Sequence, residues 1–441
     1  MEYHFYYHTM ADGTVKQVNP FTGVEVWSVP GRGNKPLGDN FSKVAPAPIG
    51  DQVREDYCAF CYGRMYETAP EKARVISHDG RFHTLQRIPP STFTEMVPVF
   101  RRVSNLFEIL SVDYWRKNYN YKLSALNLRW KEDYLADPVG LKHVMDLIDY
   151  KLRRSGKSDE EISQVSLENR FVMADAFFGG GHEMIIAQPH FTADAMDVEG
   201  LYSTGDMSDE EHYQYYMFII EAMADIVANN RYVRSLSVFK NWLPPAGATF
   251  DHLHTQVVAI DEWGESMERQ IKMVIQDKNV YNAFGPNFAA HHNLVFAEND
   301  YALAYVGIGH RFPTIEIYSR SVHARPGDHT QDEVRGMSDL VRAVHAAIGG
   351  NVSVNEEWHH TPLDSIFKIP WHVFIKLRVN TPAGFEGGTS IFINPMKPND
   401  LRDQIVPHLY ELRTSGNIAS SIRIAEECVL RPNPLDYYKT S

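Results

Sequence analysis

The alternation of hydrophobic and polar residues predicts a strand–helix–strand unit that occurs twice along the chain. In the first unit, an apolar strand at 182–187 precedes a long helix that starts after Ser208, because Ser208 and Glu211 have the spacing of a capping box. The helix body, 215–227, carries apolar residues on more than one face, which is typical of a largely buried helix. A strand at 233–239 and a loop rich in proline and glycine complete the unit.

The second unit repeats this order of elements. It has a strand at 314–318, a helix whose start is marked by the capping-box pair Thr330 and Glu333, a strand at 351–355 and then His372. The repetition predicts an α+β fold of two pseudo-repeated halves, each with an antiparallel sheet and a long helix.

The rest of the chain is assigned by composition and pattern. The first fifty residues predict a turn-rich arm around a short strand at 24–29, and 37–56 predict a loop. A charged helical stretch forms an insertion at about 91–170 in which no chemistry is recognisable. The predicted domains are therefore 1–290, which contains this insertion, and 291–441.

Composition narrows the class of protein. The 441 residues include 43 Lys and Arg against 56 Asp and Glu, a net charge of −13, which argues against a protein that coats nucleic acid or an anionic membrane. Three cysteines cannot form a disulfide framework, which favours a reducing compartment. The most apolar stretch, 215–228, is interrupted by Glu221 and Asp225 and is too short to span a bilayer. We expect a cytoplasmic protein with neither nucleic acid nor membrane as a partner.

Two cysteines in a C-x-x-C motif, Cys58 and Cys61, are the first candidate for chemistry. Such a motif can be a redox dithiol, half of a metal site or a coincidence of spacing. A redox dithiol is expected where a strand leads into a helix N-terminus, but this motif lies between a loop and Tyr62-Gly63-Arg64. A zinc site needs two further ligands, and the chain is rich in histidine.

The motif His252-Leu253-His254-Thr255-Gln256 is more specific. If the segment is a strand, both histidines point to one face, about 6.6 Å apart. The preceding loop contains Pro244, Pro245 and Gly247, which allow backbone N–H groups to approach a ligand closely. An isolated H-x-H can equally be a pair of structural histidines.

These residues resemble the active strand of galactose-1-phosphate uridylyltransferases and the related ADP-sugar phosphorylases, the transferase branch of the histidine-triad (HIT) superfamily. Leu253 replaces the proline that is usual in this family. Further resemblance, in chain order, is carried by segments of the N-terminal arm, the C-x-x-C motif, a strand that ends at Pro189-His190 and a glycine-rich segment near the C-terminus. These are 20–36, 58–61, 183–190 and 384–395, with the active strand preceded by 239–249.

The resemblance implies a structural zinc ion held by Cys58, Cys61, His190 and His252. Four protein ligands fill the coordination sphere of zinc, so no position remains for a catalytic water. The ion would fix one end of the H-x-H segment and so orient His254.

The resemblance also implies that His254 is the nucleophile. Its neutral imidazole would attack the α-phosphorus of a nucleoside-diphosphate sugar and form a nucleotidyl-histidine, which orthophosphate or a sugar phosphate then resolves. Gln256 would donate to a phosphate oxygen without activating water, and in this family a glutamine here marks transfer rather than hydrolysis.

Substrate contacts follow from the same resemblance. Asn241, Gly247 and Thr249 match the phosphate-binding loop, and Arg32 adds a positive charge near the nucleotide phosphates. Glu386 would accept hydrogen bonds from sugar hydroxyls.

The second half offers a contrast. If His372-Val373-Phe374 aligns with His252-Leu253-His254, Phe374 takes the place of the nucleophile and this half is not catalytic. Some family members carry a second metal here, which we do not expect, and we interpret His359 and His360 as structural.

The leading hypothesis is a nucleotidyltransferase or nucleotide-sugar phosphorylase. The alternatives are a HIT-superfamily nucleotide hydrolase, which Gln256 disfavours, and a non-catalytic zinc-stabilised nucleotide-binding protein, which an intact His254 disfavours. Family members are commonly dimers, which leaves a homodimer open.

Overall fold

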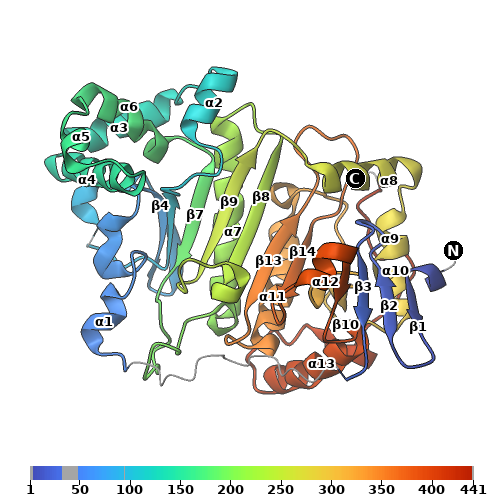
Figure 1. The fold of residues 1–441 in the computed structure, drawn as a ribbon. Helices are drawn as coiled ribbons and strands as arrows, with labels where there is room; N and C mark the ends of the chain where they lie inside the picture. The colour runs from blue at the N-terminus through green and yellow to red at the C-terminus, as the bar shows by residue number, and fades with distance from the viewer. Residues whose placement is uncertain (1–2, 32–47, 94, 440–441) are drawn as a thin grey trace.

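The computed structural model describes residues 3–31, 48–93 and 95–439. Its largest element is one continuous sheet, to which the two halves of the chain contribute equally (Figure 1). The strands from the first half are β4 (Glu71–His78), β5 (Arg81–Gln86), β6 (Phe100–Ser104), β7 (His182–Ala187), β8 (Ser235–Trp242) and β9 (His254–Ile260). The second half supplies β10 (Val295–Glu298), β11 (Ala302–Val306), β12 (Thr314–Ser319), β13 (Val354–His359), β14 (His372–Leu377) and β16 (Arg423–Ile424).

The order of these strands has a local twofold pattern. It runs β16-β10-β11-β12-β14-β13-β8-β9-β7-β6-β4-β5, and the neighbours pair antiparallel. Counted outward from the central pair β8 and β13, the first five strands of both halves have the same order, whereas the outermost strands, β5 and β16, come from different places in the chain. The predicted α+β fold is confirmed, and the two predicted sheets are fused into one. The predicted division at 290/291 falls within the short helix α10 (Pro286–His291) and stays a prediction.

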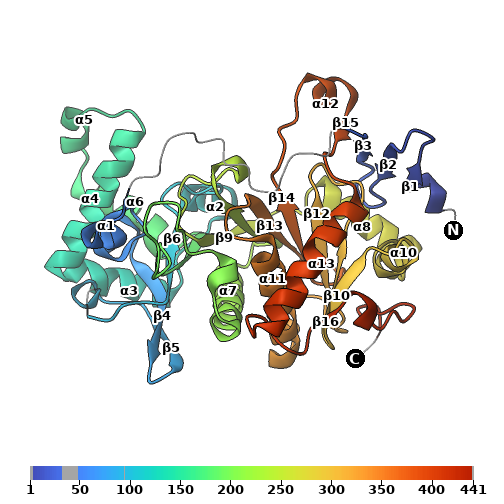
Figure 2. The ribbon, with the colours of Figure 1, turned by 90° about the horizontal axis from the view of Figure 1, so that it is seen from below.

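The two long helices lie side by side on one face of this sheet, as Figure 2 shows. They are α7 (Asp209–Asn229) and α11 (Gln331–Ile348), and a hydrogen bond of 2.7 Å joins His212 Nδ1 to Ser338 Oγ between them. Both predicted capping boxes are present. The predicted strand at 351–355 begins later, at Val354, because a turn follows Gly349 and Gly350.

A helical lobe packs against the first half of the sheet (Figure 1). The predicted insertion at about 91–170 also contains β6, which lies inside the sheet, so only its later part is the lobe. The predicted loop at 37–56 contains α1 (Asp51–Asp56), and 37–47 lies outside the described residues. The helices of the lobe are α2 (Val112–Tyr119), α3 (Ala125–Ala136), α4 (Pro138–Arg154), α5 (Asp159–Ser163) and α6 (Leu167–Phe178).

The N-terminal arm forms a small sheet with a segment from near the C-terminus. β3 (Glu25–Ser28) pairs parallel with β15 (Ile391–Ile393), and α12 (Gly384–Thr389) precedes β15. This sheet and α12 project from the second half of the large sheet (Figure 2). The other strands of the arm are β1 (Tyr7–Thr9) and β2 (Val15–Val18).

The remaining α-helices follow β9 in the chain. None of the helices in the described ranges is both long enough and apolar enough to cross a bilayer. The further α-helices are α8 (Glu265–Gln276), α9 (Val280–Phe284) and α13 (Pro398–Thr414). The short 3₁₀ helices among the described residues are η1 (Tyr3–Phe5), η2 (Tyr62–Glu67), η3 (Pro90–Thr92), η4 (Thr204–Asp206), η5 (Pro244–Ala246), η6 (Pro326–Asp328) and η7 (Ala425–Glu427).

A buried ion pair joins the two central strands beneath the long helices. Lys240 of β8 lies opposite Glu356 of β13, and Lys240 Nζ donates to Glu356 Oε2 at 2.5 Å. His345 of α11 and Tyr216 of α7 also bond to this carboxylate, at 2.8 and 3.1 Å. Burial alone would raise the pKa of Glu356, but Lys240 and His345 hold it well below its ordinary value. The Glu356 carboxylate therefore connects the two halves of the sheet and both long helices through hydrogen bonds.

Removing one partner of this pair should be costly. Glu356→Leu leaves the Lys240 ammonium buried without a counter-charge, so we expect the free energy of unfolding to fall by about 3–5 kcal/mol. The double variant Lys240→Met/Glu356→Leu should recover much of this loss. Chemical denaturation measures both, and Asp146→Ala, which breaks the exposed Lys142–Asp146 pair, should cost no more than about 0.5 kcal/mol. A decrease of less than about 1 kcal/mol in the free energy of unfolding of Glu356→Leu would contradict the role assigned to the Lys240–Glu356 pair.

Candidate active site and metal centre

The candidate site lies where the chain turns from β8 to β9. After β8 the chain passes through η5 and reaches Gly247 with φ +89, a conformation that favours glycine. Asn355 Nδ2 of β13 donates to Ala246 O at 2.8 Å and fixes this loop to the second half. Only His254 lies in β9, since the strand begins there and His252 lies in the bend before it. The expectation that both histidines of the H-x-H segment lie on the strand is therefore wrong.

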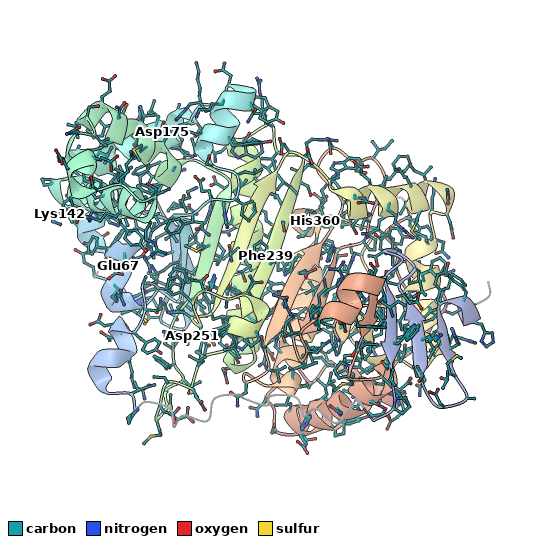
Figure 3. The ribbon with its side chains drawn as sticks, in the orientation of Figure 1. Glu67, Lys142, Asp175, Phe239, Asp251 and His360 are labelled. Carbon is teal, nitrogen blue, oxygen red and sulfur yellow. The ribbon has the colours of Figure 1, made fainter. Side chains whose placement is uncertain are left out.

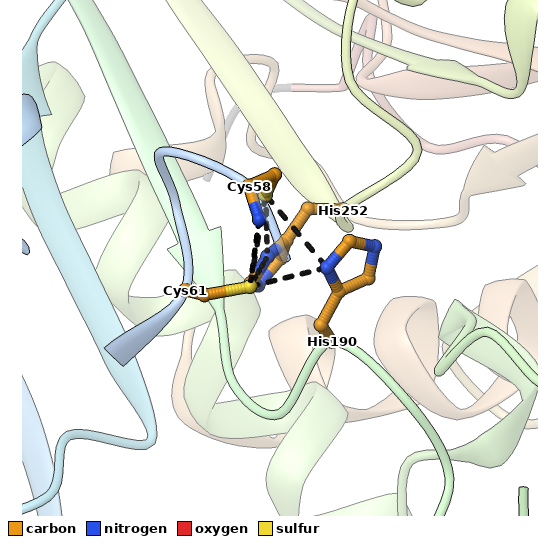
Figure 4. A group of neighbouring side chains, drawn as sticks. All are labelled: Cys58, Cys61, His190 and His252. Atoms are coloured by element: carbon orange, nitrogen blue, oxygen red, sulfur yellow. Dashed lines mark hydrogen bonds between the residues drawn. The ribbon is translucent and has the colours of Figure 1, made fainter. Parts of the chain in front are cut away.

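Four buried side chains from distant parts of the chain meet beside this bend (Figure 4). Their ligand atoms all lie within 4.8 Å of one another. Cys58 Sγ is 3.8 Å from Cys61 Sγ, and the four sulfur-to-Nδ1 distances range from 3.2 to 3.8 Å. The four residues are Cys58, Cys61, His190 and His252, the predicted ligand set.

The geometry of this cluster fits a tetrahedral metal ion. Zinc bonds of about 2.3 Å to sulfur and about 2.0–2.1 Å to nitrogen require about 3.8 Å between sulfurs and about 3.5 Å between sulfur and nitrogen. The hydrogen bond from Cys58, together with the two imidazoles, lowers the pKa of the Cys61 thiol, which favours the thiolate that binds metals. The cluster can therefore hold a metal ion through two sulfurs and two imidazoles.

Backbone and carboxylate groups orient the two histidines of the cluster. His252 Nε2 donates to Ala187 O at 2.6 Å, which leaves Nδ1 to face the cysteines. Asp251 Oδ1 lies 3.3 Å from His190 Nε2, the arrangement in which a carboxylate supports a metal-binding imidazole. Figure 3 labels Asp251 at the end of the sheet where β9 begins. Sequence analysis missed Asp251, although its place next to His252 was a usable signal.

His254 is held with one ring nitrogen bonded and the other available. Its Nδ1–H donates to His252 O at 2.8 Å, and for Nε2 the described part of the chain offers no hydrogen-bond partner. The residue is 6% exposed, and burial lowers its pKa to about 4, so the ring is neutral at neutral pH. A neutral imidazole with a free Nε2 can act as a nucleophile.

Two predicted phosphate contacts lie close to His254. Gln256 is on the same face of β9, two residues further along. Phe239 pairs with Gln256, so the same register places Asn241 of β8 beside His254. The structure thus brings His254, Gln256 and Asn241 together, and their roles stay predictions.

A cavity of about 350 Å³ opens beside Asn241 along the central strands. Phe239 and His360, both labelled in Figure 3, line it together with polar side chains of β13. One of these side chains is Glu357. Burial alone would raise its pKa, but His359 and Lys376 hold this pKa at about 2. The polar lining of the cavity consists of Ser235, Ser237, Asn241, Asn355, Glu357, His359 and His360.

The other predicted substrate residues are placed less closely. Gly247 and Thr249 are exposed in the loop before β9. Glu386 Oε2 accepts from the backbone N–H of Ala383 at 2.8 Å at the start of α12, which projects over the second half of the sheet and away from β9 (Figures 1 and 2). Arg32 lies outside the described residues. The roles of all four stay predictions.

The strand register corrects the expected alignment of the second half. His372 and His254 are each the first residue of their strand, and each donates Nδ1–H to the carbonyl two residues earlier at 2.8 Å. Phe374 lies opposite Glu357 as Gln256 lies opposite Phe239. His372 therefore takes the place of His254, and Phe374 that of Gln256.

Comparisons with known proteins agree with this fold. A family model described as a domain of unknown function (DUF4921) matches residues 10–437. No curated protein matches the sequence. The crystal structure of an ADP-glucose phosphorylase from Arabidopsis thaliana with bound ADP-glucose is similar, with a TM-score of 0.56 and 17% identity over 89% of this chain and 97% of that one. The X-ray structure of a GalT-like protein from Arabidopsis thaliana is also similar, with a TM-score of 0.54 and 17% identity over 88% of this chain and 97% of that one. The resemblance drawn from the sequence is confirmed as a likeness of fold.

The cluster predicts one bound metal ion per chain. Cys61→Ser replaces a thiolate ligand with a poorly coordinating hydroxyl, so the purified variant should lose most of its metal and unfold at a lower temperature. Mass-spectrometric metal analysis and thermal unfolding measure these effects. Cys428→Ser, which alters the third cysteine away from the cluster, is the matched control and should keep its metal. Full metal occupancy in Cys61→Ser would refute the assignment.

Proposed function

The chain belongs to the DUF4921 family, and we propose that it is a nucleotidyltransferase that acts on a nucleoside-diphosphate sugar through a nucleotidyl-histidine. The observation that carries the proposal is the geometry of His254. Its Nδ1–H is bonded to His252 O, and its Nε2 is left as the nucleophilic atom on a strand that begins beside the metal cluster. The fold shared with the ADP-glucose phosphorylase and GalT-like structures supports the same class of substrate.

The proposed reaction has two displacements at one phosphorus atom. In the first, the Nε2 lone pair of His254 forms a bond to the α-phosphorus. The bond from this phosphorus to the bridging oxygen breaks, and the electron pair leaves with the sugar 1-phosphate. In the second, an oxygen of the acceptor phosphate attacks the same phosphorus and the P–N electron pair returns to Nε2. The hydrogen bond from Nδ1–H to His252 O stabilises the positive charge that the ring carries in between.

Residues around His254 serve the phosphate groups in this proposal. The side-chain amides of Gln256 and Asn241 donate to phosphate oxygens, and the backbone and hydroxyl groups of Gly247 and Thr249 bind the same groups from the loop. Arg32 is assigned the charge that binds the nucleotide phosphates, and Glu386 is assigned to the sugar. The cavity beside Asn241 offers polar space for the leaving sugar phosphate and for the acceptor.

Zinc is the metal that we assign to the cluster. Bound by two cysteines and two histidines, it would have no open position for substrate, and its chemistry would be structural. Through His252 the cluster fixes the carbonyl that orients His254. Loss of the metal should therefore impair labelling of His254 without removing the nucleophile.

The nucleotidyl-histidine can be tested by covalent labelling. Incubation with nucleoside-diphosphate sugars labelled at the α-phosphorus, with adenine and uracil as bases, should leave acid-labile, base-stable label on the protein. His254→Ala removes the attacking nitrogen, so we expect labelling to fall by about three orders of magnitude or more. Addition of orthophosphate or a sugar phosphate to labelled protein should discharge the label.

His372→Gln is the matched control because His372 occupies the equivalent position in the second half. It should keep labelling per folded molecule. Label discharged by water as fast as by phosphate would indicate a hydrolase. Nucleotide binding without label in the wild type would indicate a non-catalytic binding protein.

A further inference from the structure

We propose that His182 and Asn355 are positioning residues that hold the carboxamides of Gln256 and Asn241 with their amino groups facing the substrate phosphates. The inference deepens the proposed function and rests on it. A carboxamide can present either a donor or an acceptor, and only the donor is attractive to a phosphate oxygen. Which end faces the substrate is decided by the groups behind each amide.

Two donors lie behind Gln256. The backbone N–H of Ile109 donates to His182 Nδ1 at 3.1 Å, so the hydrogen of this neutral ring is on Nε2, which lies 2.9 Å from Gln256 Oε1. The backbone N–H of Phe107 donates to Asn105 Oδ1 at 2.8 Å, which directs Asn105 Nδ2 toward the same Gln256 oxygen at 3.5 Å. Asn105 Nδ2 and His182 Nε2, 3.1 Å apart, are then neighbouring donors to one acceptor. Gln256 therefore turns its oxygen inward and its amino group outward.

A second chain of hydrogen bonds orients Asn241, and we call each of these two chains a relay. Arg378 Nη1 donates to Asn355 Oδ1 at 2.8 Å, which makes Nδ2 the free end of the Asn355 amide. Asn355 Nδ2 then donates to Asn241 Oδ1 at 2.7 Å and to Ala246 O at 2.8 Å. Because guanidinium has no acceptor, this chain of bonds has one direction. Asn241 also turns its oxygen inward and its amino group outward.

Both outward amino groups are left for a ligand. Within the described ranges no protein group accepts a hydrogen bond from Gln256 Nε2 or Asn241 Nδ2. His182 is 2% exposed, and its burial lowers its pKa, which keeps the ring neutral and the direction of the relay fixed. Preorganised donors of this kind need no reorientation when charge develops on phosphate oxygens.

The two relays come from different halves of the chain. His182 begins β7 in the first half, whereas Asn355 and Arg378 follow α11 in the second. Asn241 and Asn355 are register partners in the central pair of strands. The second half, which lacks the metal cluster, thus contributes to the site by orienting a donor.

Double-mutant cycles on formation of the nucleotidyl-enzyme test the inference. His182→Phe removes the closer of the two donors behind Gln256, and Asn355→Asp presents an acceptor that turns the Asn241 amide around. Each should slow single-turnover labelling by about 10- to 100-fold. In a Gln256→Ala background His182→Phe should have little further effect, and the same holds for Asn355→Asp in an Asn241→Ala background.

A merely structural role would give a different pattern. In that case the effects of the paired substitutions would multiply instead of saturating, and this result would overturn the inference. Unchanged labelling in His182→Phe or Asn355→Asp would also overturn it. His143→Phe is the matched control, since it removes a buried histidine that bonds to Tyr134 and Thr68 in the helical lobe. It should leave labelling per folded molecule unchanged.

Crystal structures with bound ADP separate this inference from the proposed function. If the wild type binds ADP but forms no nucleotidyl-enzyme, the proposed function is refuted and the positioning role is not. The positioning role then predicts Gln256 Nε2 and Asn241 Nδ2 within hydrogen-bond distance of phosphate oxygens in the wild type, and the Asn241 amide reversed in Asn355→Asp. If neither amide contacts a phosphate oxygen, or if ADP does not bind, the result would count against both the proposed function and the positioning role.

Discussion

The pairing of β8 with β13 holds together both the hydrophobic core and the candidate site of this protein. It fuses two similar half-sheets into one, and its two faces carry different chemistry. On the helix-covered face, Lys240 and Glu356 form a buried ion pair with contacts from α7 and α11. On the opposite face, Asn241 and Asn355 form a hydrogen bond beside His254. A change in the register of this one pair would therefore disturb the core and the candidate site together.

The metal cluster makes the site asymmetric within a symmetric scaffold. In the first half, His252 in the bend before β9 joins the cluster and leaves its carbonyl to orient His254. In the second half, Pro370 stands at the equivalent position and also accepts the histidine Nδ1–H, but it cannot bind a metal. The same backbone geometry is thus kept in both halves, while the ligand chemistry is present in one.

Packing explains why the second half of the sheet does not offer an equivalent open face. The ring of His372 stacks between Tyr318 at 4.3 Å and His359 at 5.0 Å. Tyr281 of α9 covers this region, 5.8 Å from His372, and Phe21 of the N-terminal arm stacks on Tyr281 at 4.7 Å. His372 is consequently a core residue whose pKa burial holds well below its ordinary value. Phe21 of the N-terminal arm and apolar residues of α8, α9 and α10 share one hydrophobic cluster with Tyr318 and cover this face.

Local sequence patterns and the family resemblance were sufficient to predict the long helices and the metal ligands. The capping pairs Ser208–Glu211 and Thr330–Glu333 predicted both long helices, and spacing together with family resemblance predicted Cys58, Cys61, His190 and His252 as one cluster. The residues that support the site could not be predicted in this way, because Asp251, His182 and Asn355 act through partners distant in the chain or through side-chain direction. The folded chain also shows that His372, and not Phe374, matches His254. An alignment of short motifs cannot detect a shift of two residues, whereas hydrogen-bond register fixes it.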